Sequence, residues 1–245
     1  MSQMIRVIVN GAKGRMGSEA VNAIHAEPDL ELAAQIDLGD DLAQAIKTTK
    51  ADVVVDFTRP DCVLKNVHTI IEQGVGGVVG TTGFSPAQIT ELTQRCEGRS
   101  PAILIAPNFA IGALLMMHCA QIVAKFMPKA EIIEFHHDKK LDAPSGTAVK
   151  TAELIAKASP ETIVPRETFE IGPRGDLFFG IPVHSVRLPG LLAHQEVIFG
   201  AEGQTLTLRH DSISRGCFMP GVVLSCREVM KRTGLIYGLD TILFE

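Results

Sequence analysis

The sequence predicts an α/β protein with a doubly wound parallel-sheet domain and a second, α+β domain whose sheet is mixed or antiparallel. Up to residue 107, short apolar runs alternate with helix-like stretches, which is typical of a parallel sheet covered by helices on both faces. After Asn108 this rhythm changes, and several strand-like runs follow one another with no helix between them. Such runs favour antiparallel or mixed pairing, so we expect two separate domains.

Five strand-like runs organise the first part. They are short and apolar, and the run Ala51–Phe57 is typical of a fully buried strand. We expect strands at Ile5–Val9, Leu30–Ile36, Ala51–Phe57, Gly76–Gly80 and Ala102–Ala106, and helices at Arg15–His25, Leu42–Lys47, Pro60–Gln73 and Pro86–Cys96.

The second part opens with a long apolar helix and continues mainly as strands. We expect helices at Ile111–Phe126 and Thr147–Ala158, and strands at Glu131–His137, Thr168–Ile171, Phe178–Leu188, Gln195–Phe199 and Thr205–His210, with a hairpin turn at 201–204. Helical spacing returns at Val222–Lys231, which indicates that the chain rejoins the first domain. The predicted domains are therefore 1–107 with 218–245, and 108–217.

Composition and charge argue against several classes of protein. Hydrophobic residues make up 46% and charged residues 21% of the chain, as in ordinary globular proteins. A net charge of -5 gives no reason to expect nucleic acid or a membrane as a partner, and no apolar run approaches the ~20 residues of a membrane span. The five cysteines lack Cys-x-x-Cys spacing and Met1–Arg6 has no signal-peptide pattern, so we expect a cytoplasmic protein.

A glycine-rich turn follows the first predicted strand. Gly11, Gly14 and Gly17 form a Gly-x-x-Gly-x-x-Gly pattern just before a predicted helix. A turn without side chains lets a pyrophosphate reach the backbone amides at a helix N-terminus, where the helix dipole favours negative charge. The first domain is therefore predicted to be Rossmann-like, with cofactor contacts at Gly11, Ala12, Lys13, Gly14, Arg15 and Met16.

An acidic residue, Asp37, ends the second predicted strand. A carboxylate at this place can hold the ribose hydroxyls of a dinucleotide, and a solvated strand-end carboxylate is the alternative. Asp37 would repel the extra phosphate of NADP and Leu38 offers no arginine clamp, whereas Lys13 and Arg15 could supply compensating charge or simply attract the pyrophosphate. The hypothesis is that NADH and NADPH are both used, with NADH favoured.

Two later loops are predicted to complete the cofactor site. Residues 80–83 and 106–109 each follow an apolar strand, at the carboxyl edge where doubly wound folds bind ligands. Taken alone, either loop could be an ordinary turn rich in small residues. The predicted contacts are Gly80, Thr81, Thr82, Ala106, Pro107, Asn108 and Phe109.

The segment Glu134–Thr147 carries most of the predicted chemistry. It runs from the end of a strand to the start of a helix and reads Glu-Phe-His-His-Asp-Lys-Lys-Leu-Asp-Ala-Pro-Ser-Gly-Thr. Histidine supplies a proton near neutral pH, and a lysine adds charge-assisted hydrogen bonds to an anion. We expect Lys140 to have such a role and Lys139 to be a solvated surface residue.

The end of this segment predicts an anion site. Ser145 suits the N-cap of the following helix, which would leave the amides of Gly146 and Thr147 free to bind a carboxylate. Because successive strand residues face opposite ways, His136 and His137 are not expected to share a metal ion, and no metal site is predicted.

The segment also resembles the signature of bacterial dihydrodipicolinate reductases (4-hydroxy-tetrahydrodipicolinate reductases). The matching residues are Glu134-Phe-His-His-x-x-Lys140-x-Asp-Ala-Pro-Ser-Gly-Thr-Ala148. Shorter motifs at 11–17, 56–58, 80–83, 106–109, 185–187 and 210–215 extend the resemblance over nearly the whole chain.

This resemblance implies an NAD(P)H-dependent reduction of the cyclic condensation product of pyruvate and aspartate semialdehyde, on the route to diaminopimelate and lysine. It implies that His136 exchanges a proton, and that Lys140 is a second proton donor and a carboxylate contact. The dinucleotide would bind to 1–107 with 218–245, and a homotetramer would form through strands between Phe178 and His210. The dicarboxylate substrate would be bound by His137, Ser145, Gly146 and Thr147.

Two other functions stay open on the residues alone. Another two-domain dehydrogenase, of an amino-acid semialdehyde or imine, would act on aspartate or related amino acids. A dinucleotide-binding sensor would bind NADH without oxidising it. Such a function would not explain the His-His-x-x-Lys pattern. Consumption of NADH with the condensation product distinguishes these functions from the predicted one.

Overall fold

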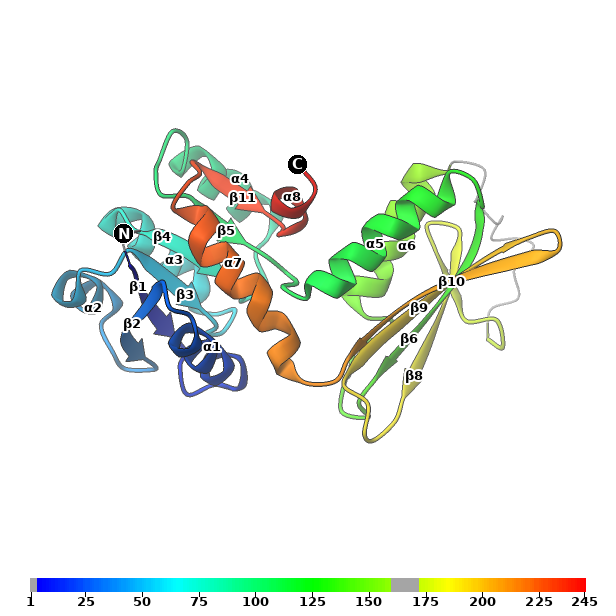
Figure 1. Cartoon of the computed structure of the whole chain (residues 1–245), viewed down its shortest axis with the longest axis horizontal. Coiled ribbons are helices and arrows are strands. Elements are labelled where there is room, and N and C mark those ends of the chain that lie inside the picture. Colours follow the sequence, from blue (N-terminus) through cyan, green and yellow to red (C-terminus); the bar gives the residue numbers. More distant parts are fainter. Residues whose placement is uncertain (1–3, 160–171) are drawn as a thin grey trace. The chain divides into compact units, whose positions relative to one another are not determined.

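The computed structural model describes residues 4–159 and 172–245, which form two compact units. The first unit comprises Met1–Ala110 and Phe218–Glu245, and the second comprises Ile111–Cys217 (Figure 1). The strand expected at Thr168–Ile171 lies outside the described residues.

A six-stranded sheet with the order β11-β5-β4-β3-β1-β2 forms the centre of the first unit. All of its neighbouring strands pair in parallel. Because β3 is buried on both faces, its sequence Val-Val-Val-Asp does not alternate. The strands are β1 (Ile5–Asn10), β2 (Leu30–Ile36), β3 (Val53–Asp56), β4 (Gly76–Val79), β5 (Ile103–Ile105) and β11 (Leu235–Tyr237).

Helices cover both faces of this sheet, which confirms the predicted doubly wound architecture. Helices α1 (Arg15–Ala26) and α7 (Met219–Val229) pack on one face. On the other face lie α2 (Leu42–Thr49), α3 (Val63–Gln73) and α4 (Pro86–Arg95), whose buried side chains form one core with the strands. A short helix, α8 (Asp240–Leu243), follows β11 near the end of the chain.

The chain returns to the first unit through α7 and β11. Strand β11 pairs with β5 along Leu235–Tyr237, and it is too short for periodicity to reveal it in the sequence. Helix α7 lies so close to the turn that contains Phe109 that a Cβ on Gly221 would be 2.1 Å from the carbonyl oxygen of Phe109. Arg227 donates to Asp29 at 2.6 and 2.8 Å, which fixes α7 to the turn before β2.

The second unit contains a five-stranded mixed sheet with the order β10-β9-β6-β8-β7. The pair β6 and β8 is parallel and the other pairs are antiparallel, as the predicted mixed sheet requires. Helices α5 (Ile111–Ala124) and α6 (Gly146–Ala158) pack against this sheet (Figure 1), and η3 (Arg215–Phe218) leads out of the unit. The strands are β6 (Lys129–His136), β7 (Asp176–Phe178), β8 (Ile181–Arg187), β9 (Ala193–Ala201) and β10 (Gln204–Ser212).

The single strand expected at Phe178–Leu188 is wrong. The structure has a tight hairpin there, in which Phe178 of β7 pairs with Ile181 of β8. The two turn residues, Phe179 and Gly180, both have positive φ angles, 54° and 79°, as a two-residue hairpin turn of type I′ requires. A phenylalanine in the left-handed region conceals the turn in the sequence, because large side chains are uncommon there.

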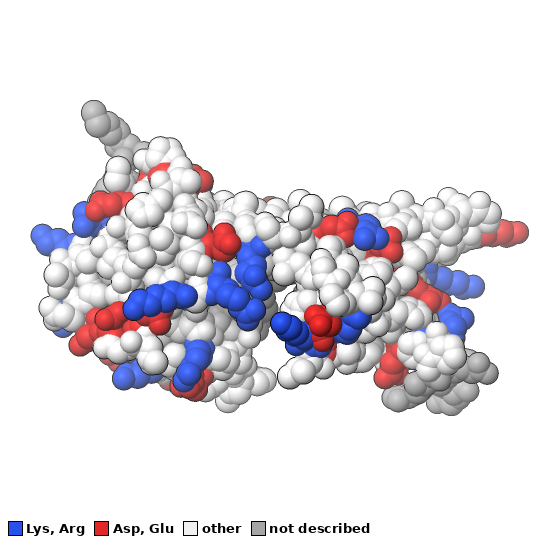
Figure 2. All heavy atoms as spheres, turned by 90° about the horizontal axis from the view of Figure 1, so that it is seen from below, with Lys and Arg blue, Asp and Glu red and all other residues white. Residues whose placement is uncertain are grey.

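Charged side chains of both signs are interspersed over the face drawn in Figure 2. None of the helices within 4–159 and 172–245 is long and apolar enough to cross a membrane.

Gly221→Ala is expected to lower the free energy of unfolding by about 1–3 kcal/mol, because its methyl group would overlap the Phe109 carbonyl and force α7 away. Urea unfolding measures this change. Gly200→Ala is the control, since a Cβ there meets nothing within 4 Å. Unchanged stability of Gly221→Ala would contradict the close approach of α7.

Candidate active site

The predicted glycine loop joins β1 to α1 and has little room for side chains. A Cβ on Gly11, where φ is +81°, would lie 2.5 Å from the Phe57 carbonyl oxygen, and one on Gly17 would lie 2.0 Å from the Gly11 carbonyl oxygen. Gly14 is the N-cap of α1 and provides no side-chain cap. The backbone amides of Arg15 and Met16 donate no hydrogen bond to any of the described residues. This helix end therefore fits an anionic group such as a pyrophosphate.

The side chain of Asp37 binds a backbone amide of the glycine loop. Its carboxylate accepts from the amides of Leu38 and Lys13, both at 2.8 Å, and these two hydrogen bonds lower the pKa of Asp37. A carboxylate can accept about four hydrogen bonds, so acceptor capacity for ribose hydroxyls is left. The side chain of Leu38 is 91% exposed and adds no charge beside it.

A buried carboxylate, Asp56, connects the loops at the carboxyl edge of the sheet. It lies at the end of β3 with 0% exposure. Its oxygens accept from the side-chain amides of Asn10 and Asn66 at 2.9 and 2.8 Å, and from the hydroxyls of Thr58 and Thr81 at 2.7 and 3.1 Å. The loop that contains Thr81 is thereby fixed to β1, β3 and α3.

The three predicted cofactor loops meet around Phe57. A Cβ on Gly80 would lie 2.0 Å from the Phe57 ring, and Gly11 approaches the Phe57 carbonyl. The ring of Phe109 packs edge-on against the Phe57 ring, with 6.0 Å between centroids. Asn108 accepts from the amide of Ala110 at 2.9 Å, which closes the turn that contains Phe109. The structure thus brings residues of all three loops together in the first unit.

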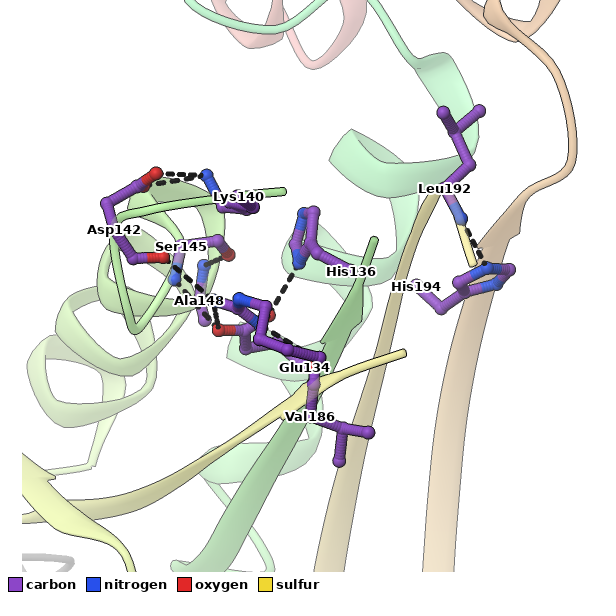
Figure 3. Close-up of polar contacts among 10 residues, drawn as sticks. Glu134, His136, Lys140, Asp142, Ser145, Ala148, Val186, Leu192 and His194 are labelled. Atoms are coloured by element: carbon purple, nitrogen blue, oxygen red, sulfur yellow. Dashed lines mark hydrogen bonds and ion pairs between the residues drawn. The ribbon is translucent and has the colours of Figure 1, made fainter. Parts of the chain in front are cut away.

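In the second unit, the carboxylate of Glu134 lies at the centre of a polar network (Figure 3). It is fully buried, at 0% exposure. His136 Nδ1 lies 2.5 Å from Oε2, and the amide of Ser145 donates to Oε1 at 3.1 Å. Arg187 donates to both oxygens, at 2.7 and 2.8 Å. One carboxylate therefore joins β6, β8 and the turn before α6.

Glu134 is ionised at neutral pH in spite of its burial. Burial alone raises the pKa of a carboxyl group. Here the hydrogen bonds from His136 and Arg187 outweigh burial and lower the pKa of Glu134 to about 2.

Lys140 is held by a carboxylate of its own turn. Its Nζ donates to both oxygens of Asp142 at 2.7 and 2.8 Å (Figure 3). The Asp142 carbonyl oxygen accepts from Arg187 at 2.8 Å, so this turn is tied to the Glu134 network. Lys139 is exposed, as predicted for a surface lysine, whereas the Lys140 side chain is only 20% exposed.

The start of α6 confirms the predicted N-cap. Ser145 Oγ accepts from the amide of Ala148 at 3.2 Å. The backbone amides of Gly146 and Thr147 donate no hydrogen bond within the described part of the chain. These two donors are free for a carboxylate at the positive end of the helix dipole.

The strand ends at His136, one residue earlier than predicted. His137 therefore lies in the following turn, where its carbonyl oxygen accepts from the amide of Lys140 at 3.1 Å. Strand alternation does not apply to His137, and it does not force the two rings to opposite faces. No group of three His, Cys, Asp or Glu residues that could hold a metal ion is present in 4–159 and 172–245.

Sequence reasoning gave no structural role to four charged residues that connect the site segments. These are Asp56 in the first unit, and Glu134, Asp142 and Arg187 in the second. One signal for Glu134 was available, because residues two apart on a strand share a face, and Glu134 therefore faces the same way as His136.

Together, a parallel-sheet unit with dinucleotide-type loops and a second unit with a histidine, a lysine and an open helix end define a two-domain, nicotinamide-dependent oxidoreductase. Two family models cover almost the whole chain: "Dihydrodipicolinate reductase, N-terminus" matches residues 5–109 and "Dihydrodipicolinate reductase, C-terminus" matches residues 112–243. The chain belongs to the dihydrodipicolinate reductase family, which confirms the resemblance seen in the sequence.

Individual relatives match over nearly their full length. The chain is 48% identical over 239 residues to the 4-hydroxy-tetrahydrodipicolinate reductase of Coxiella burnetii (strain Dugway 5J108-111), covering 98% of this chain and 99% of that one. It is 50% identical over 240 residues to the Legionella pneumophila (strain Paris) enzyme of that name, covering 97% and 99%. A dipicolinate-bound dihydrodipicolinate reductase from Paenisporosarcina sp. TG-14 has a TM-score of 0.89 at 42% identity, covering 98% of this chain and 100% of that one.

Asp56→Asn is expected to weaken dinucleotide binding and lower stability. The new amide group would face donors that now point at a carboxylate oxygen, and each donor left without an acceptor costs about 1–3 kcal/mol. Thermal unfolding and NADH titration measure the two effects. Asp52→Asn, before the same strand, is the control, because its remaining oxygen can still accept from the Arg6 amide. Unchanged NADH affinity in a destabilised Asp56→Asn variant would refute the role of Asp56 in fixing the loops.

Proposed function

We propose that this protein reduces 4-hydroxy-tetrahydrodipicolinate (dihydrodipicolinate after loss of one water) to tetrahydrodipicolinate with NADH or NADPH, in diaminopimelate and lysine biosynthesis. The observation that carries the proposal is the network around Glu134, in which a histidine ring, a lysine turn and a helix N-terminus are tied together. Membership of the reductase family and the dipicolinate bound to the Paenisporosarcina enzyme support the choice of a cyclic dicarboxylate.

The substrate residues that we propose lie in the second unit. One carboxylate of the substrate accepts from the amides of Gly146 and Thr147, beside the Ser145 N-cap. Lys140 and His137 contact the substrate from the neighbouring turn. Two carboxylates need at least two groups of donors, and Lys140 together with the free amides supplies one of them.

The cofactor residues that we propose lie in the first unit. The pyrophosphate accepts from the glycine loop and the start of α1, and Asp37 accepts from ribose hydroxyls. The nicotinamide supplies the hydride when the cofactor is bound. The loop contacts are Gly11, Ala12, Lys13, Gly14, Arg15, Met16, Gly80, Thr81, Thr82, Ala106, Pro107, Asn108 and Phe109.

The protein residues then have to manage one proton. His136 and Lys140 are the donors that we assign to the reacting ring of the substrate. His136 Nδ1 is occupied by Glu134, so Nε2 is the atom that exchanges the proton. Lys140 leaves Asp142 for a substrate carboxylate, which exchanges one ion pair for another.

We further propose a cytoplasmic homotetramer that assembles through the second unit, with no nucleic-acid or membrane partner. The strands between Phe178 and His210 are the proposed interface. Among the strands that the structure describes in that unit, β7 and β10 lie at the two edges of the sheet, and edge strands suit pairing or packing with another subunit.

His136→Ala and Lys140→Ala are each expected to reduce kcat by at least about 10²-fold, because each removes a proton donor. NADH affinity should stay within about twofold, since both residues lie in the unit that does not contain the glycine loop. NADH oxidation with substrate generated in place, together with NADH titration, tests this. Lys139→Ala is the matched control and should retain activity, whereas near-normal turnover in both site variants would remove the assignment.

Cofactor choice is expected to be dual, with NADH favoured, because Leu38 supplies no cation for the extra phosphate of NADPH. Leu38→Arg should improve NADPH affinity relative to NADH by about tenfold, or about 1.4 kcal/mol. Titration of both cofactors into both proteins measures the ratio. An unmodified protein that binds NADPH a thousandfold or more tightly than NADH would contradict this expectation.

A further inference from the structure

The buried carboxylate Glu134 lies within hydrogen-bonding distance of His136 and is bonded to Arg187 and Ser145. We infer that Glu134 is a positioning residue: it fixes the tautomer and orientation of the His136 ring, and it ties that ring to the anion-binding end of α6. This inference rests on the proposed function, in which His136 exchanges a proton with the substrate.

The hydrogen-bond geometry defines the tautomer. An ionised carboxylate has no proton to donate, so at the 2.5 Å contact the His136 Nδ1 must carry the hydrogen. The other ring nitrogen, Nε2, is then the atom left to exchange a proton. When Nε2 gives up its proton, the ring remains a neutral imidazole that still donates to Glu134 through Nδ1.

Arg187 prevents the carboxylate from turning. It donates to Oε1 at 2.7 Å and to Oε2 at 2.8 Å, a bidentate pair that fixes the carboxylate plane. Arg187 comes from β8, where it lies opposite His136 of β6 in the parallel register. The paired strands β6 and β8 therefore carry Glu134, His136 and Arg187 in one rigid arrangement.

The same carboxylate reaches the anion site. Its Oε1 accepts from the Ser145 amide at 3.1 Å, which places the N-cap and the free amides that follow it. Arg187 also donates to the Asp142 carbonyl oxygen at 2.8 Å, in the turn of Lys140. A shift of Glu134 would therefore move the proton-exchanging ring and both anion contacts together.

A second histidine and carboxylate pair, which joins β6 to β8, offers a matched control. Glu131 lies 2.8 Å from His184 Nε2 and also contacts an arginine, Arg174. It has the opposite strand parity from Glu134, so it faces away from the site, and its side chain is 38% exposed. Glu131→Gln breaks the same type of contact on the same strand without reaching His136.

The direct test is nitrogen-15 NMR of the unmodified protein, with the His136 ring assigned by comparison with His136→Ala. At a pH where the ring is neutral, we expect the Nδ1–H tautomer. The Nε2–H tautomer in the unmodified protein would overturn the inference, whatever the enzymatic activity.

Glu134→Gln tests the consequence of the contact. The glutamine oxygen is expected to face Ser145 and Arg187 Nη2, because Arg187 Nη1 has a second acceptor in the Val186 carbonyl at 2.8 Å. The amide nitrogen then faces His136 Nδ1 and forces the Nε2–H tautomer. The kcat should fall by about 10²-fold or more, but not below that of His136→Ala.

A double-variant cycle separates positioning from general damage. In the His136→Ala background, Glu134→Gln should change kcat by less than about threefold, because the ring on which it acts is gone. Losses that multiply, or an equal loss in Glu131→Gln, would show that Glu134 acts only through stability and would overturn the inference. If Glu134→Gln does not fold, Arg187→Met is added to remove the unpaired cation. The His136 tautomer of this double variant is then measured by NMR, and the Nε2–H form is expected.

The outcomes also separate this inference from the proposed function. An unmodified protein that does not oxidise NADH with 4-hydroxy-tetrahydrodipicolinate refutes the function, while its His136 tautomer still tests the geometry. An active protein with the wrong tautomer refutes the positioning role alone.

Discussion

The arrangement of the candidate active site depends on one buried negative charge, that of Glu134. An ionised carboxylate that is fully buried is stable only when charged and polar donors surround it, and here an arginine, a histidine and a backbone amide do so. Removing one partner of such a buried pair typically costs about 3–5 kcal/mol. The carboxylate therefore forces three separate chain segments into one geometry.

The first unit also contains a buried carboxylate, Asp56, but its hydrogen-bond donors are uncharged. Asp56 is as fully buried as Glu134, but the hydrogen bonds to its side chain come from two asparagines, two threonine hydroxyls and one backbone amide. Both carboxylates lie on a central strand, where backbone position is well defined, and both fix loops at that place. Loops would otherwise be mobile, so a rigid strand residue gives them the accuracy that binding and catalysis require.

The sequence predicted those features that local physics determines. Gly11 and Gly17 are required by close backbone approach, and Ser145 by the N-cap, so local patterns revealed them. The clamp of Arg187 on Glu134 joins two strands far apart in sequence, and β11 exists only because β5 offers an open edge. Such pairings depend on the assembled sheet, and no spacing in a single sequence encodes them.

The ion pair of Lys140 with Asp142 and the ion pair of Arg187 with Glu134 differ in strength, and this difference suits the proposed reaction. The Asp142 carboxylate that holds Lys140 is 64% exposed, and an ion pair of this kind contributes only about 0–1 kcal/mol. A substrate carboxylate can replace Asp142 at little cost. The pair of Arg187 with the fully buried Glu134 is not open to such exchange, because separation would leave a buried charge. In the proposed reaction, the substrate would therefore take over the lysine contact, while the Glu134–Arg187 pair beside His136 would stay in place.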